Sequence, residues 1–162
     1  MTDAPRVPPH HDPGCWGCGD APDGIRLPEP DAEGTERYEA RFRFDERHQG
    51  GPGLAHGGLV AAALDEACGL LASWYHFPVV TARLVVRFRL PVPINRELTV
   101  RSVLDRAEGR RIYVRGELAD GAEVLADARA SFAHVLLEHF LGTPEGRTAG
   151  DAWRRRLAEP PA

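Results

Sequence analysis

The segment from His56 to Ala72 constrains the fold most, because it has the composition of a buried helix and yet carries two acids. Most of its residues are alanine, leucine or other apolar types, which favour helix and leave no polar face for solvent. Gly57 and Gly58 open this run and would present backbone N–H groups at the helix start, where an anion can bind. Asp65 and Glu66 lie in its middle, and burying an ionised carboxylate is costly unless it is paired or hydrated. We therefore expect one of the two acids to face a cleft or a second subunit.

The overall composition indicates one globular domain. The chain has 162 residues and a formal net charge of -4, which argues against nucleic acid as a partner. It has no apolar run of about 18 residues and no signal-peptide core, so we expect a cytoplasmic protein without membrane contact. All 20 basic residues are arginine, which excludes Schiff-base lysine chemistry.

The N-terminus combines a polar arm with a pair of cysteines. Residues 1–14 are rich in proline and polar groups, which predicts a mobile arm. Cys15 and Cys18 have the spacing of a metal-binding pair, with His10 and His11 as conceivable further ligands. A zinc site normally takes four ligands from two such pairs. Because only one pair is present, we favour a reduced structural turn and predict no metal and no cofactor.

Two segments precede the predicted helix. Residues 37–44 alternate between apolar and polar types, which indicates a half-buried strand. Residues 46–55 contain three glycines and a proline, so we expect a loop there, with His48 at the surface.

Beyond the helix, which should end before Pro78, the pattern changes to an alternation of period two over about fifty residues. It predicts four further strands, with turns near Gly109 and at the pair Asp120-Gly121, which tolerates positive φ. The polar residues from 142 to 162 predict a solvated tail, so the folded domain would span residues 15–141. One long helix against an antiparallel sheet is an α+β arrangement.

This succession of elements resembles the hotdog fold, in which an antiparallel sheet wraps around one long central helix. The sequence resembles the acyl-CoA thioesterases of the phenylacetate-pathway type and their mammalian relatives. The resemblance covers roughly residues 15 to 135. It rests on His56-Gly57-Gly58, on Asp65, and on residues 80–84 leading to Arg89-Leu90-Pro91-Val92-Pro93.

The resemblance implies an acyl-CoA thioesterase that needs no cofactor. In such enzymes the acid matching Asp65 is the general base or nucleophile, and the backbone N–H matching Gly57 polarises the thioester carbonyl. The residue matching Thr81 places the attacking water or the acid, and the one matching His56 supports the site. The chemistry is physically sound, since thioester hydrolysis needs a donor aimed at the oxyanion and a base aimed at water.

Helix geometry adds an expectation about assembly. Gly57 and Asp65 are eight residues apart, about 12 Å along a helix, whereas reacting atoms must approach to about 3.5 Å. One helix therefore cannot supply both groups to one substrate. We expect Gly57 of one protomer to meet Asp65 of another across a two-fold interface, in a homodimer or homotetramer.

Several alternatives stay open. The chain is also compatible with a non-catalytic hotdog module that binds acyl-CoA or acyl carrier protein, or with a hotdog dehydratase that uses His56 with Glu66. A helix-capping role is an alternative for His56, and a support or surface role is expected for Glu66. Several relatives carry an asparagine on the loop ahead of His-Gly-Gly, and within residues 49–53 the only amide side chain is that of Gln49. Thr81 has the strand parity of the arginines. The acyl pocket is expected to include the aromatic residues after the helix, Trp74, Tyr75 and Phe77, and the N-terminal arm.

Overall fold

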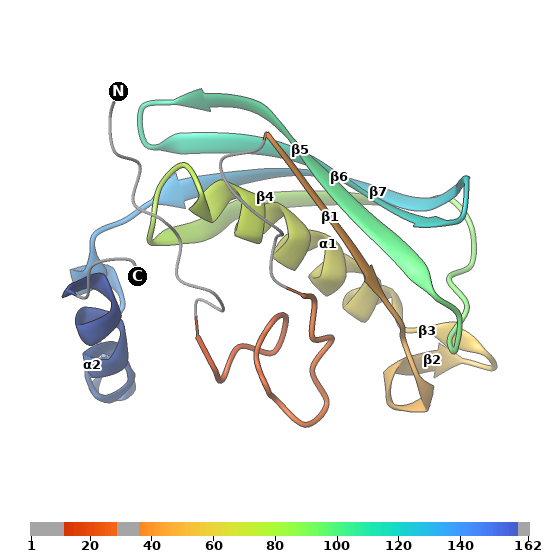
Figure 1. Cartoon of the computed structure of the whole chain (residues 1–162), viewed down its shortest axis with the longest axis horizontal. Coiled ribbons are helices and arrows are strands. Elements are labelled where there is room, and N and C mark those ends of the chain that lie inside the picture. The colour runs from red at the N-terminus through yellow and green to blue at the C-terminus, as the bar shows by residue number, and fades with distance from the viewer. Residues whose placement is uncertain (1–11, 29–35, 159–162) are drawn as a thin grey trace.

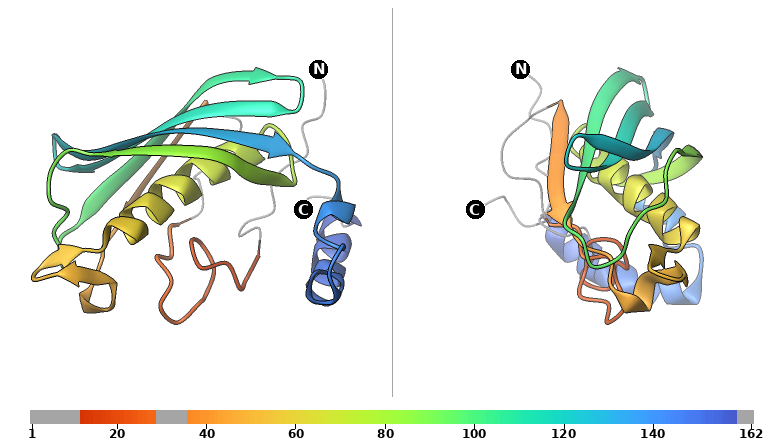
Figure 2. Two further views of the ribbon diagram at one scale, coloured as in Figure 1. Left: turned by 180° about the vertical axis from the view of Figure 1, so that it is seen from behind. Right: turned by 90° about the vertical axis from the view of Figure 1, so that its right-hand side faces the viewer.

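Five antiparallel strands form one sheet that curves around a central helix (Figures 1 and 2). The structure, a computed structural model, describes residues 12–28 and 36–158, so most of the predicted N-terminal arm lies outside the described residues. The helix is α1 (Gly57–Ser73). Across the sheet the strand order is β1 (Arg37–Phe42), β5 (Leu98–Glu108), β6 (Arg111–Asp120), β7 (Glu123–His134) and β4 (Val79–Phe88). This is the hotdog fold, as the sequence predicts.

Helix α1 is buried against the concave face of the sheet because almost none of its surface is polar. Val60, Leu64 and Leu71 are at most 1% exposed. The helix approaches the sheet closely at Gly116, where a Cβ atom would lie 2.9 Å from the sulfur of Cys68. A polar contact also crosses this layer where the Ser102 hydroxyl donates to the Ala67 carbonyl at 2.8 Å. The helix ends before Pro78, as predicted.

The connections agree with the predicted turns apart from a shift of one residue. Gly109 adopts a φ of 58° between β5 and β6. Between β6 and β7, Asp120 pairs with Glu123, so the two-residue loop consists of Gly121 and Ala122. Gly121 takes the positive φ, 60°, that such a tight hairpin requires.

Strand β4 forms one edge of the sheet and contains a bulge. The register with β7 shifts between Thr81 and Arg83, which leaves Ala82 as the extra residue. Because of this shift Thr81 pairs with the buried Phe132 and lies on the helix-facing side of the sheet. The extra residue Ala82 shifts the alternation of side-chain directions along β4, so Thr81 and the arginines that follow face opposite sides of the sheet.

The loop before α1 is more ordered than its glycines suggest. It contains a 3₁₀ turn, η1 (Glu46–His48), and a small hairpin of β2 (Gln49–Gly51) and β3 (Leu54–Ala55). The prediction that His48 lies at the surface is wrong, since its side chain is buried. Its Nδ1 accepts a hydrogen bond from Asp45 N–H at 3.0 Å, and its carbonyl accepts one from His56 N–H at 2.8 Å. His48 therefore anchors this loop to the start of α1.

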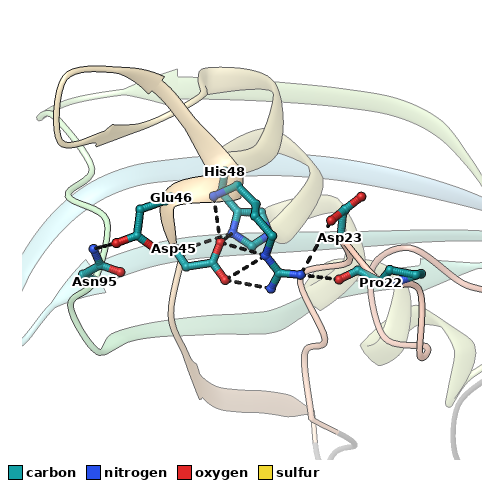
Figure 3. A network of polar contacts seen from close by, with 7 residues as sticks. Pro22, Asp23, Asp45, Glu46, His48 and Asn95 are labelled. Carbon is teal, nitrogen blue, oxygen red and sulfur yellow. Dashed lines mark hydrogen bonds and ion pairs between the residues drawn. The ribbon is translucent and has the colours of Figure 1, made fainter.

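A polar network ties the same loop to two distant segments (Figure 3). The Asp45 carboxylate accepts hydrogen bonds from the Arg47 side chain, whose guanidinium also donates to the Pro22 carbonyl. Asn95 donates to Glu46 at 2.7 Å. The network holds segment 12–28 and the turn before β5 against η1.

The C-terminal residues do not form the expected solvated tail. Residues Leu137–His139 form the 3₁₀ turn η2, and α2 spans Pro144–Ala158. The Trp153 ring packs against Phe77 and Phe140, with centroid distances of 5.2 and 5.0 Å. Helix α2 and the β2–β3 hairpin lie at opposite ends of the molecule (Figure 2). No helix within residues 12–28 and 36–158 has the length and apolar character needed to span a membrane.

Candidate active site

Asp65 lies at the middle of α1 and meets a residue of the edge strand. The Thr81 hydroxyl lies 3.0 and 3.2 Å from the two carboxylate oxygens of Asp65. A hydroxyl has one proton and donates to one of these oxygens at a time, so the other oxygen can accept a proton from elsewhere. Burial raises the pKa of Asp65 above its ordinary value, and the hydrogen bond from Thr81 opposes that rise. Asp65 is thus a carboxylate oriented by Thr81 with raised proton affinity.

A cavity of about 220 Å³ opens beside this pair. Four polar side chains line it, Asp65, Glu66, Ser73 and Thr81, and three aromatic side chains form much of its apolar wall, Phe77, Phe132 and Trp153. Phe77 was predicted as a pocket residue, whereas Trp74 and Tyr75 do not line this cavity. The cavity therefore places the Asp65 carboxylate beside aromatic side chains, one of which, Trp153, belongs to α2.

Larger hollows lie over the outer face of the sheet. One, of about 590 Å³, is lined by residues of β1, β5 and β6 that include Arg101 and Glu39. These two side chains pair with each other, as the guanidinium of Arg101 lies 2.7 Å from a Glu39 oxygen. The hollow is a groove between paired surface charges and does not reach Asp65.

The start of α1 forms a second, separate feature. His56 is the N-cap, and its Nδ1 accepts a hydrogen bond from Gly58 N–H at 3.0 Å. Gly57 N–H donates to none of the residues that the structure describes. Gly57 borders a shallow hollow of about 360 Å³ together with Leu54, Phe88 and Leu90, which are 38–55% exposed. The first helical N–H is thus presented at an exposed apolar surface.

One protomer does not bring all the predicted site residues together. Asp65 and Thr81 form one group, and His56 with Gly57 forms another at the helix start. The two groups border different hollows. Gln49 lies near the second group, where its side-chain oxygen accepts a hydrogen bond from Gly53 N–H at 2.9 Å and shapes the loop.

Glu66 is neither a surface residue nor a partner of His56. Its carboxylate faces the cysteine turn, where Cys15 Sγ lies 3.7 Å from Glu66 Oε2. The pKa of Cys18 is raised by a hydrogen bond with Cys15, by burial and by the charge of Glu66. Sequence patterns do not reveal this contact because Cys15 and Glu66 are 51 residues apart. In the sequence these residues stand out only separately, as a closely spaced cysteine pair and as an acid on an apolar helix, and nothing local indicates that they meet.

Comparison with known proteins supports the resemblance seen in the motifs. A sequence model described as the thioesterase superfamily matches residues 52–126. Acyl-coenzyme A thioesterase THEM4 of Bos taurus is 39% identical over 66 residues, which are 41% of this chain and 27% of that protein. Its counterpart from Xenopus laevis is 29% identical over 89 residues, which are 55% of this chain and 40% of that protein. The matches thus span less than half the length of these curated relatives.

A solved structure extends the comparison to the fold. The putative thioesterase of Ralstonia eutropha JMP134, a phenylacetic acid degradation-related protein, aligns with a TM-score of 0.61. It is 20% identical and covers 67% of this chain and 85% of that one. The protein is therefore a hotdog-fold chain whose central part, residues 52–126, matches the thioesterase superfamily.

Proposed function

We propose that this protein hydrolyses acyl-CoA thioesters to a free acid and CoA. The observation that carries the proposal is the Asp65 carboxylate, which is half-buried, hydrogen-bonded by Thr81 and open to a cavity that has polar and aromatic walls. A module that only binds acyl groups gains nothing from an acid in that position, since desolvating it is costly. The names of the matching relatives agree with this activity.

Asp65 acts as the general base or as the nucleophile of the reaction. As a base, it accepts a proton from a water molecule whose oxygen attacks the thioester carbonyl carbon. The tetrahedral intermediate then collapses, the carbon–sulfur bond breaks, and the CoA thiolate leaves and takes up a proton. Thr81 orients the carboxylate during this transfer, because its hydroxyl holds one of the two oxygens.

The oxyanion donor is the Gly57 N–H of a second protomer. The first N–H groups of a helix lack partners within the helix and lie at the positive end of its dipole, so they stabilise a developing negative charge. The exposed side chains of Leu54, Phe88 and Leu90 surround Gly57, and such a patch is typical of a protein interface. His56 fixes the orientation of this helix start through its cap.

Strand β4 provides the surface through which two protomers meet. As an edge strand of the sheet it offers backbone groups for pairing with another chain, and its Val85 and Phe88 are 48% and 55% exposed. An isologous dimer across this edge has two equivalent sites, each with Asp65 and Thr81 from one chain and Gly57 from the other. The acid on the apolar helix then faces a cleft between subunits.

A thiol-release assay tests the proposal. We expect the wild-type protein to release CoA from at least one acyl-CoA in a chain-length series, and Asp65→Asn to be slower by about 10²- to 10⁴-fold. Glu117→Gln is a matched control, because this acid lies on the outer face of the sheet in an ion pair with Arg101. Equal rates for wild type and Asp65→Asn would contradict the catalytic role. Binding of acyl-CoA without any thiol release would favour the non-catalytic module.

A further inference from the structure

Three potential metal ligands meet beside the candidate site. The sulfurs of Cys15 and Cys18 and a carboxylate oxygen of Glu66 lie within 4.8 Å of one another. Cys18 is only 2% exposed, and the other two side chains are half-buried. We refer to these three residues as the Cys-Glu cluster. It joins segment 12–28 to α1 at the residue that follows Asp65.

The cysteine turn is held in place by backbone hydrogen bonds on both sides. Gly19 N–H donates to the Cys15 carbonyl at 2.8 Å, and Leu27 N–H donates to the Gly17 carbonyl at 2.9 Å. Gly17 N–H also points at the sulfur of Cys15, 3.3 Å away. A donor so placed stabilises negative charge on the sulfur, as a thiolate ligand requires. The turn therefore presents its sulfurs before any ion arrives.

The contact between the turn and Glu66 requires glycine at position 17, because there is no room for a side chain there. A Cβ atom at Gly17 would collide with the Glu66 carboxylate. The glycine thus allows the backbone of the turn to lie directly against this carboxylate. The two potential metal-binding atoms, Cys15 Sγ and Glu66 Oε2, are 3.7 Å apart. Two ligands of a tetrahedral zinc ion, with Zn–S near 2.3 Å and Zn–O near 2.0 Å, stand about 3.5 Å apart.

We propose that Cys15, Cys18 and Glu66 bind one Zn²⁺ ion, with water in the fourth position. Two thiolates and a carboxylate are ligands that zinc accepts in tetrahedral sites, and soft sulfur donors select against Mg²⁺ and Ca²⁺. In the metal-free protein the Cys15 thiol donates to Glu66, and on zinc binding the 2+ charge of the ion replaces the protons that the two thiols release. This inference does not depend on thioester hydrolysis.

The zinc ion has a structural role next to the candidate active site. It links a segment that lacks helices and strands to α1, and so couples the order of residues 12–28 to the helix. Glu66 also borders the cavity that contains Asp65. Fixing Glu66 therefore orders the wall of this cavity next to Asp65.

The test uses the full chain, without a histidine tag, and measures metal content and cobalt spectra. We expect about one zinc per chain by elemental analysis after purification in zinc-containing buffer. Replacement of zinc by Co²⁺ should give a thiolate-to-cobalt charge-transfer band. Zinc removal with a chelator should lower the melting temperature. Glu66→Gln keeps the side-chain shape and should weaken Zn²⁺ affinity by more than the roughly 10- to 100-fold typical of outer-shell partners.

The third cysteine supplies the control. Cys68 lies on α1, like Glu66, and is buried, but its sulfur packs against Gly116 outside the Cys-Glu cluster. Cys68→Ala should therefore keep both the bound zinc and the cobalt band. Cys18→Ser should lose both. If Cys18→Ser fails to fold, Glu66→Gln decides the result. Wild-type protein that retains no zinc and gives no cobalt band, or a band that is unchanged in Glu66→Gln, would overturn the proposal.

Discussion

Mixing two variants that we expect to be inactive tests the proposed site shared between protomers directly. Asp65→Asn removes the proposed base, and Gly57→Pro removes the proposed oxyanion donor. Proline is tolerated at the first position of a helix, and the preceding His56 has the extended backbone, φ -63° and ψ 132°, that a following proline requires. A Cβ atom at Gly57 makes only ordinary contact with Phe88, at 3.6 Å. The substitution therefore deletes one N–H group and leaves α1 in place.

The expected recovery of activity follows from the geometry of α1. Within one helix the two groups are about 12 Å apart and cannot serve one substrate. Each variant alone should lose about 10²-fold or more in kcat. In an equal mixture with free subunit exchange, half of the dimers are heterodimers, and each has one intact site of two. The mixture should regain about one quarter of wild-type activity.

The assay is thiol release after co-refolding, with heterodimers counted by mass spectrometry of the native protein. Gly57→Ala keeps the N–H group and should retain most of the activity, which controls for the change of side chain. Heterodimers that form but remain as inactive as the parents would refute a site shared between protomers. A Gly57→Pro variant with wild-type kcat would refute the oxyanion role.

Three further predictions concern single residues. Thr81→Val should lower kcat about tenfold, because a hydrogen bond to a charged group contributes about 1.5 kcal/mol, and Thr81→Ser should restore it; equal kcat values would contradict the orienting role. Trp153→Ala removes an aromatic wall of the cavity and should raise kcat/KM for longer acyl chains relative to shorter ones, so an unchanged chain-length profile would argue against the cavity as the acyl site. The hydrogen bonds from Arg47 lower the pKa of Asp45 from 3.8 to about 2. Since the folded-state pKa is the lower one, this stabilisation is fully present above pH 3.8 and is lost as the pH falls through about 2. Urea titrations should show Asp45→Asn as less stable than wild type at pH 7, and this difference should vanish below pH 2.

Much of the fold is encoded in local patterns. The apolar run of α1 predicts a buried helix, and the alternation in β6 and β7 predicts strands with one buried face, because each periodicity reflects one environment along the element. Asp65 was identifiable for a related reason, since a carboxylate on such a helix requires a special setting. Both patterns can be recognised without knowing which distant segments of the chain pack together.

The edge strand shows where local patterns stop being sufficient. From parity alone Thr81 belongs with the arginines of β4, and only the bulge at Ala82 turns it toward Asp65. A bulge of this kind depends on pairing with β7, which starts about forty residues later. The orientation of a proposed active-site residue was therefore decided by the partner strand.

The sequence by itself determined the central helix, the sheet and the acid at the middle of α1, because hydrophobic periodicity and helix geometry are local properties. Only the tertiary structure decided what surrounds that acid. It buried His48, placed Trp153 of α2 at the cavity and brought the cysteine turn against Glu66. The contacts of Trp153 and of the cysteine turn join segments far apart in the chain, and which distant segments meet depends on the packing of the whole domain.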